Sequence, residues 1–169
     1  MKTFADFRAA YDLPFAELAL RAGNAHRGGR GHADVQRCAL LSIKTGGCPE
    51  DCTYCGQSAH YDTPVEREPL LEVAAVKAKA IAAQARGATR FCMGAAWRQP
   101  RDGAEFDRVL EMVREVRGLG MEACVTLGML TPSQAERLAE AGLTAYNHNL
   151  DTSREHYPAI VTTRTYDER

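Results

Sequence analysis

The stretch TRFCMGAAWRQPRDGAEFDRVLEMVREVRGLGMEACVTLG, residues 89–128, decides the fold, because its hydrophobic pattern changes from strand to helix and back. Residues 89–96 and 121–128 are short apolar runs typical of buried strands. Between them, apolar side chains recur at helical spacing, at Phe106, Val109, Leu110, Val113 and Val116. Gly118 and Gly120 end this helical pattern. The stretch therefore predicts a strand–helix–strand unit with parallel strands.

The same alternation extends in both directions along the chain. CALLSIKT, residues 38–45, reads as an earlier buried strand, and residues 70–86 carry small and apolar side chains at helical spacing before Gly87. After residue 128, Thr131 and Pro132 are suited to begin a third helix, which closes at Gly142. Residues 144–150, TAYNHNL, then read as a fourth strand.

The predicted fold class is α/β, with parallel βα units forming roughly half of a (β/α)₈ TIM-type barrel and a short N-terminal helical extension. Right-handed crossovers leave two arrangements open, a doubly wound sheet and part of a barrel, for which about 250 residues are typical. No glycine-rich GxGxxG turn follows the first strand, which weakens the dinucleotide-binding alternative.

Two regions are expected, an N-terminal helix with a flexible connection over residues 1–34 and the partial barrel over residues 35–169. The connection is assigned to residues 22–33, AGNAHRGGRGHA, because they carry no hydrophobic period. His26, His32 and the later His60 are scattered among loops, so we expect them to be solvated and not to bind metal.

Composition favours small-molecule chemistry in the cytoplasm. The chain is 45% hydrophobic and 25% charged, with a net charge of −1 and no runs of like charge, which argues against nucleic acid and membrane surfaces as partners. Charged residues interrupt the first 20 positions, and no apolar run approaches the length of a membrane span. In a reducing compartment, closely spaced cysteines more often bind metal or do redox work than form a disulfide.

Three cysteines, Cys48, Cys52 and Cys55, lie in the loop GGCPEDCTYCGQS that directly follows the first strand. This loop belongs at the carboxyl edge of the sheet, where α/β folds place their chemistry. The spacing CxxxCxxC supplies three thiolates, whereas a closed zinc site and an ordinary 4Fe-4S cluster each take four ligands. A 4Fe-4S cluster here would keep one iron open for a substrate or a chelating cofactor. A zinc-binding or structural cysteine loop remains an alternative.

With Tyr54 just before the last cysteine, this motif resembles the radical S-adenosylmethionine (radical SAM) superfamily. Within it, the segments LSIKTGGCPEDCTYCGQS, TRFCMGAAWR, MEACVTLG, YNHNLDTS and TTRTYDER resemble the biotin synthase family over residues 35–169. The resemblance implies a 4Fe-4S cluster on the three loop cysteines and S-adenosylmethionine on its open iron, beside Tyr54. It also implies a 5′-deoxyadenosyl radical that drives sulfur insertion into dethiobiotin, with a 2Fe-2S cluster as the sulfur donor.

Cys92 and Cys124 lie at equivalent places in the second and third strands. Because side chains alternate along a strand and neighbouring strands lie ~4.8 Å apart, both thiols can point into one space. The resemblance makes them ligands of the 2Fe-2S cluster and leaves Cys38 as a neighbour. Without it, the favoured explanation of all three cysteines is that of a small buried residue.

Asn147, Asn149 and Asp151 fall on one face of the expected fourth strand. Asparagine amides suit a ureido ring, and a carboxylate suits the paired hydroxyls of ribose. The resemblance implies that Asn147 and Asn149 contact dethiobiotin or the ribose, that Asp151 binds the ribose, and that Arg169 pairs with the methionine carboxylate. The alternative is an Asn/Asp-rich strand end that caps the next turn.

The resemblance further implies an electron donor such as flavodoxin or ferredoxin, and a homodimer for the full-length enzyme. The family pattern continues with another cysteine, an arginine and four more strands. We therefore expect either a piece of a longer enzyme or a half barrel completed by another chain, with the 169-residue chain inactive by itself. The alternative function is a non-catalytic fragment that binds iron–sulfur or zinc through the CxxxCxxC loop.

Overall fold

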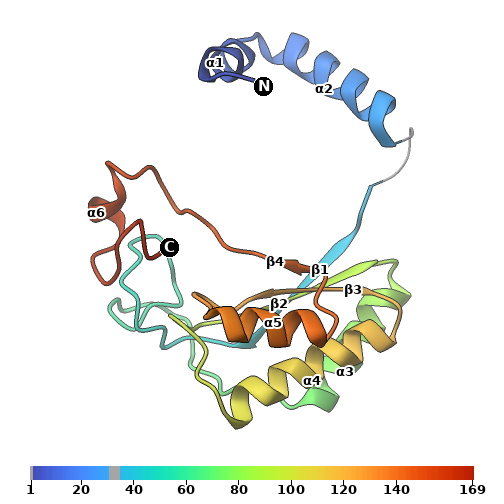
Figure 1. Cartoon of the computed structure of the whole chain (residues 1–169), viewed down its shortest axis with the longest axis vertical. Coiled ribbons are helices and arrows are strands. Elements are labelled where there is room, and N and C mark those ends of the chain that lie inside the picture. The colour runs from blue at the N-terminus through green and yellow to red at the C-terminus, as the bar shows by residue number, and fades with distance from the viewer. Residues whose placement is uncertain (1, 31–34) are drawn as a thin grey trace. The chain divides into compact units, whose positions relative to one another are not determined.

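The computed structural model describes residues 2–30 and 35–169. The chain divides into two compact units, with the boundary between Val35 and Gln36. The first unit consists of α1 (Phe4–Tyr11) and α2 (Phe15–Arg30) (Figure 1). Thr3 begins α1 with a capping box, in which Thr3 and Asp6 each accept a hydrogen bond from the other's backbone N–H. The expected N-terminal helical extension is therefore present, as two helices.

The flexible connection expected over residues 22–33 is wrong for residues 22–30, which form the second half of α2. Each of the three glycines in this stretch costs a helix about 1 kcal/mol relative to alanine. However, no proline interrupts the stretch, and its alanine and arginine residues are strong helix formers, so the helix that begins at Phe15 continues. Residues 31–34, and with them His32, lie outside the described residues.

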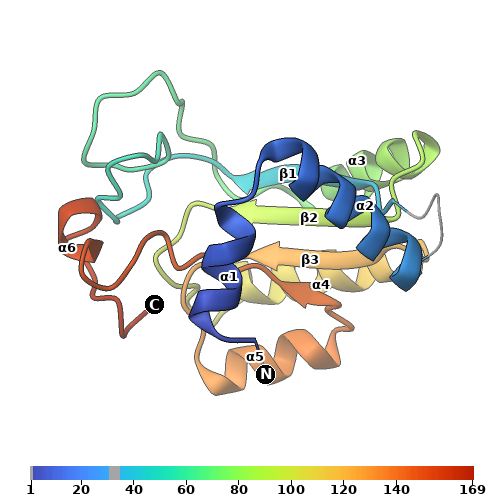
Figure 2. The same ribbon diagram turned by 90° about the horizontal axis from the view of Figure 1, so that it is seen from above.

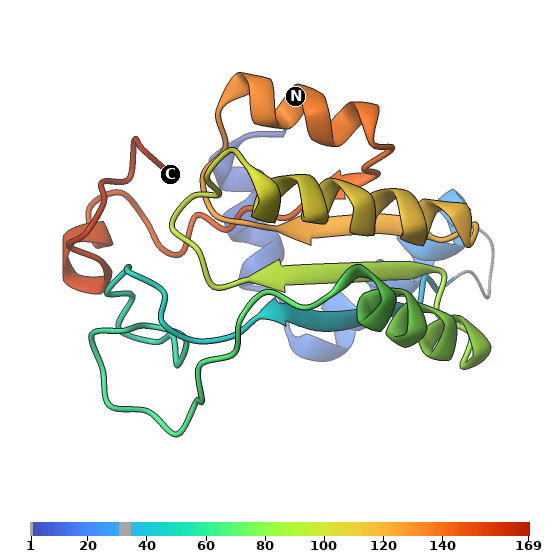
Figure 3. The same ribbon diagram turned by 90° about the horizontal axis from the view of Figure 1, so that it is seen from below.

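The second unit contains a four-stranded parallel sheet in the order β1-β2-β3-β4. The strands are β1 (Cys38–Lys44), β2 (Arg90–Ala95), β3 (Glu122–Thr126) and β4 (Ala145–Tyr146). The intervening helices are α3 (Val73–Ala85), α4 (Ala104–Gly118) and α5 (Pro132–Glu140). Each strand pairs with its neighbour in sequence, and the three helices lie along the same side of the sheet (Figure 3). This arrangement confirms the predicted partial barrel, because a doubly wound sheet carries helices on both faces.

The core lies between the sheet and these helices. Alternate strand residues contribute to it, including Ile43 from β1, Phe91 and Met93 from β2, and Ala123 and Val125 from β3. The predicted stripe of α4 is buried against them. Each fully buried Val, Leu or Phe contributes roughly 1.5–3 kcal/mol, so this layer holds the second unit together.

The other face of the sheet carries the intervening residues of each strand. Cys92 and Cys124 are direct partners in the register of β2 and β3, flanked by Leu40 on β1 and Ala145 on β4. In a closed barrel this face is the interior.

The fourth strand is shorter than the sequence pattern predicts. It was expected over residues 144–150, but β4 ends at Tyr146, and the last bond of the ladder runs from the Asn147 N–H to the Val125 carbonyl. β4 is the outermost strand, and its single partner β3 ends at Thr126. Beyond Tyr146 there is consequently no strand to pair with, and the chain leaves the sheet.

Two long segments follow the carboxyl ends of β1 and β4, and both lie at the same end of the sheet (Figure 2). One is the loop of residues 45–72 between β1 and α3, and the other is the segment of residues 147–169, which contains only the short helix α6 (Tyr157–Ile160). Among the described residues, no helix is both long and apolar enough to span a membrane.

Candidate functional site

A cavity of about 320 Å³ lies where these two segments meet the carboxyl ends of β1, β2 and β3. Seven residues singled out from the sequence line it: Cys48, Cys52, Tyr54, Cys55, Asn149, Asp151 and Arg169. They come from both segments, so the fold joins parts of the chain that are about a hundred residues apart. This edge is where parallel α/β sheets bind their ligands.

The three cysteines are held by hydrogen bonds within their own loop. The Cys48 N–H donates to the Gln57 carbonyl (2.9 Å), and the Ala59 N–H donates to the Cys48 carbonyl (2.8 Å). A turn follows, in which the Cys55 N–H donates to the Cys52 carbonyl (3.0 Å). These bonds fix the backbone of the loop, whose three cysteines all line the cavity.

Cys48, Cys52 and Cys55 all line the same cavity. Across residues 2–30 and 35–169, no three His, Cys, Asp or Glu side chains are placed to hold a single metal ion. Burial raises the pKa of the Cys48 thiol. Burial also raises the pKa of the Cys52 thiol, although a hydrogen bond from Arg164 opposes the shift. Binding a metal through these thiols would therefore release protons, because the thiolate is the ligand.

Asp51 ties the cysteine loop to the second segment. Its carboxylate accepts hydrogen bonds from the backbone N–H groups of Thr162 (2.9 Å) and Thr163 (3.1 Å) and from both threonine hydroxyls. The bonds from Thr162 and Thr163 hold the pKa of the Asp51 carboxyl well below its usual range. The loop is thus anchored by charge-assisted bonds, which are stronger than neutral ones.

A buried network of charges connects the two segments beside the thiols. Arg164 has a side chain that is 4% exposed, and its Nη1 lies 2.8 Å from Oε2 of Glu50, whose side chain is 3% exposed. Its Nη2 donates to Asp151 Oδ2 (2.9 Å) and to Cys52 Sγ (3.4 Å). Arg98 Nη1 lies 3.2 Å from the other Glu50 oxygen.

The sequence reasoning missed Glu50, Arg98 and Arg164 as parts of the site. Arg164 and Cys52 are 112 residues apart in the sequence, so no local spacing reveals their contact. The only available signal was the pair of acidic residues directly before Cys52 and the charged residues of the segment TTRTYDER.

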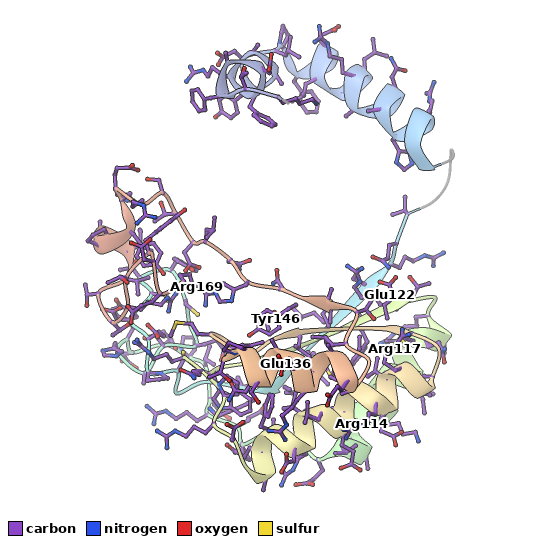
Figure 4. All side chains as sticks on the ribbon, viewed as in Figure 1. Arg114, Arg117, Glu122, Glu136, Tyr146 and Arg169 are labelled. Carbon is purple, nitrogen blue, oxygen red and sulfur yellow. The ribbon has the colours of Figure 1, made fainter. Side chains whose placement is uncertain are left out.

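Asp151 also joins this network to three further residues singled out from the sequence, Tyr54, Asn149 and Arg169. The Tyr54 hydroxyl donates to Asp151 Oδ1 (2.5 Å), and Arg169 Nε donates to the Asn149 carbonyl (2.7 Å). Arg169 Nε also lies 3.4 Å from Asp151 Oδ2, and Figure 4 shows this arginine among the side chains at this end of the second unit. Burial and then the bond to Asp151 raise the pKa of Tyr54.

Asp151 occupies the centre of this group with an unusual backbone. Its φ is 68°, in the left-handed region, and its side chain is 2% exposed. Burial opposes its ionisation, but the hydrogen bonds from Tyr54 and Arg164 outweigh it and lower the pKa of its carboxyl. Binding of ribose by Asp151 stays a prediction, and a ribose would have to share the carboxylate with these partners.

Asn147, Cys92 and Cys124 do not line this cavity. The alternation expected from Asn147 to Asp151 fails because β4 ends at Tyr146, and Asn147 is exposed. Cys92 and Cys124 lie deeper, on the sheet face opposite the helices. Burial, and then the contact with Cys124, raise the pKa of the Cys92 thiol to about 12. Cys38 is exposed on the same face of β1.

The chain is similar over nearly its whole length to biotin synthases. It is 67% identical to the biotin synthase of Methylobacterium nodulans over 168 residues, which are 99% of the chain and 50% of that protein. It is 63% identical to that of Sorangium cellulosum and 60% identical to that of Myxococcus xanthus, over 95% and 99% of the chain and 46% and 48% of those proteins. The chain thus spans about half the length of the curated relatives it matches.

Two crystal structures resemble the fold. Methylornithine synthase superimposes with a TM-score of 0.75 at 18% identity, over 98% of this chain and 49% of its own. HydG, a maturase of the FeFe-hydrogenase, gives a TM-score of 0.72 at 13% identity, over 95% and 37%. Residues 42–169, which include the three-cysteine loop and the segment that anchors it, match the sequence pattern of the radical SAM superfamily. The chain therefore belongs to the radical SAM superfamily.

Proposed function

We propose that the chain forms the N-terminal half of a biotin synthase, a radical SAM sulfurtransferase that converts dethiobiotin to biotin, the last step of biotin biosynthesis. The observation that carries this proposal is the 60–68% identity to biotin synthases over almost the whole chain, three-cysteine loop included.

Cys48, Cys52 and Cys55 would hold a 4Fe-4S cluster. In such a cluster each thiolate binds a different iron, and the three cysteines line one cavity that could enclose it. The cationic Arg164 beside Cys52 also suits a site with three thiolate charges. When bound, the cluster supplies the electron that cleaves S-adenosylmethionine and so starts hydrogen abstraction from the substrate.

Tyr54, Asn149, Asp151 and Arg169 would bind S-adenosylmethionine next to the cluster. A volume of about 320 Å³ is within the range of small-molecule sites. Arg169 is the side chain suited to the methionine carboxylate, because its planar guanidinium can donate two parallel hydrogen bonds. The hydrogen bond from Tyr54 to Asp151 would fix the aromatic ring at the edge of the cavity.

Cys92 and Cys124 would ligate the second cluster, of the 2Fe-2S type, and Asn147 and Asn149 would contact dethiobiotin. The two cysteines face each other in register on the sheet face that becomes the interior of a closed barrel. A second half of the barrel would supply the remaining ligands and the facing wall. A one-electron donor such as flavodoxin or ferredoxin, a homodimer of the full-length enzyme and a cytoplasmic location complete the proposal.

A second candidate is a non-catalytic fragment that binds iron–sulfur or zinc through the cysteine loop. Its support is that all three cysteines come from one loop and line one cavity, so the loop could bind iron–sulfur or zinc without catalysing a reaction. The zinc version is the weaker one, because a closed zinc site takes four ligands and the loop supplies three cysteines.

The test is a chimera in which residues 1–169 replace the matching half of the Methylobacterium nodulans enzyme. At 67% identity, we expect the two halves to pack, and the chimera should support growth of a biotin auxotroph on dethiobiotin. The same chimera with Cys52→Ala should not. A chimera that folds and binds iron but forms no biotin in vitro would reject the proposed activity.

A further inference from the structure

Arg164 makes buried polar contacts with four different side chains. Its Nε donates to the Tyr157 hydroxyl (2.8 Å), its Nη1 pairs with Glu50 (2.8 Å), and its Nη2 reaches both Asp151 (2.9 Å) and Cys52 Sγ (3.4 Å). Every nitrogen of the guanidinium therefore has an acceptor. The planar fork is held in one orientation, with one edge against a cysteine sulfur.

The surrounding charges form an alternating row. It runs from Arg98 through Glu50, Arg164 and Asp151 to Arg169, with separations of 3.2, 2.8, 2.9 and 3.4 Å. Arg98 also pairs with Glu168 (3.4 Å), so the charges of the row balance, and Arg164 is its cationic donor to a cysteine sulfur. Burial of ion pairs gains little stability, because the desolvation cost roughly cancels the attraction. Stability therefore does not explain why the central part of this row, Glu50, Arg164 and Asp151, is buried next to the cysteine loop.

We propose that Arg164 is a positioning residue that orients Cys52 and makes reduction of the cluster bound to the loop more favourable. The inference rests on the proposed function, namely that Cys48, Cys52 and Cys55 hold a 4Fe-4S cluster. In the reduction step, one electron from an external reductant such as dithionite converts the cluster from its 2+ to its 1+ state, and no bond or proton changes place.

The direction of the effect follows from charge. The reduced cluster is more negative than the oxidised one, and hydrogen bonds to the sulfurs are among the factors that set cluster potentials. A cationic donor at Cys52 Sγ stabilises the reduced form more than the oxidised form. Its removal should shift the midpoint potential to a more negative value and free the loop from one of its anchors.

The test compares Arg164→Gln, Arg164→Lys and a matched control in the reconstituted chain. Arg154→Gln is the control, because it removes the same charge from the same segment, where Arg154 pairs with the exposed Asp167 and stacks on Tyr166. The readouts are the midpoint potential, from a titration followed by electron paramagnetic resonance, and hydrogen exchange of residues 48–58. Neither readout depends on turnover.

Arg164→Gln should keep its iron, show a more negative potential and exchange faster in residues 48–58. Arg164→Lys should fall between this variant and the wild type, because one ammonium group keeps the charge but does not reach Glu50, Asp151 and Cys52 together. Arg154→Gln should match the wild type in both readouts. If Arg164→Gln does not fold, the test is the midpoint potential of Arg164→Lys. A value more negative than that of the wild type supports the inference, and an equal value overturns it.

Equal potentials in the wild type and both Arg164 variants would overturn the inference while the cluster assignment stands. An equal shift in Arg154→Gln would overturn it too, because the effect would then be one of overall charge. A wild-type chain that binds no iron and sulfide would instead refute the proposed function, and the inference with it.

Discussion

Cys52 is the most enclosed of the three loop cysteines. It packs with Tyr157 and Val161 in a small apolar cluster, whereas Cys48 and Cys55 are only partly buried. Cys52→Ala should abolish the charge-transfer absorbance of the reconstituted chain and most of its bound iron, because two thiolates leave half of a cluster's irons to water. Cys38→Ala, on the exposed end of β1, is the control and should leave both signals unchanged. Retention of full iron content by Cys52→Ala would exclude the loop as the cluster site.

Asp51 should make the stability of the chain depend on pH. Its pKa in the folded state lies below the ordinary value of 3.8, so the unfolded state takes up its proton first as the pH falls. The stabilisation is then complete above about pH 5 and is lost as the pH falls toward the folded pKa. Asp51→Asn should lower the free energy of unfolding by roughly 1–3 kcal/mol at pH 7.

Urea unfolding of both proteins between pH 7 and pH 3 measures this effect. The difference between wild type and Asp51→Asn should shrink with falling pH. A difference that stays constant over this range would show that the carboxylate does not anchor Thr162 and Thr163.

At the scale of elements, the turn after β3 depends on Gly128. Its φ is +86°, and an added Cβ would lie 2.2 Å from the Arg98 carbonyl oxygen. Gly128→Ala should therefore destabilise the chain by at least about 2 kcal/mol and loosen Arg98, which contacts Glu50. The measurement is the free energy of unfolding.

Gly118→Ala is the matched control for this turn. Gly118 ends α4 with nothing within 4 Å of an added Cβ, so the change should be neutral or stabilising by up to about 1 kcal/mol. Equal effects of the two substitutions would contradict the close approach of the turn to residues 97–98.

The repeating elements could be predicted from the sequence because their signals are local. The stripe of α4 and the capping box of Thr131 and Gln134 are complete within a few residues, and both are present in the structure. The end of β4 could not be predicted, because it depends on where β3 stops. The continuation of α2 through its glycines was missed because the absence of a hydrophobic period was read as a loop.

The residues of the candidate site also fall into two groups, those that local sequence could predict and those that it could not. The three cysteines were found from spacing within one loop, and Tyr54 from its place beside Cys55. The ion pairs of Arg164 with Glu50 and Asp151 join segments that are distant in sequence, so only the fold reveals them. The role of Asp51 could not be predicted either, because its partners, Thr162 and Thr163, are equally distant in the sequence.

At the scale of the whole molecule, the two proposed clusters should differ in how far they depend on the rest of the barrel. The first uses thiols of one loop, so the 169-residue chain should form it. The second would take only Cys92 and Cys124 from this chain, and two thiolates without an enclosing shell should not retain it. The chain alone, supplied with reductant, S-adenosylmethionine and dethiobiotin, should therefore form no biotin. Biotin formed by the chain alone would show that the facing wall is not needed.

The most direct test of the central claim is an iron, sulfide and zinc analysis of the anaerobically reconstituted chain, followed by an assay for 5′-deoxyadenosine. The account predicts about four iron and four sulfide per chain, no stoichiometric zinc, and 5′-deoxyadenosine formed from S-adenosylmethionine after reduction. Stoichiometric zinc in place of iron, or a complete cluster that does not cleave S-adenosylmethionine, would contradict it.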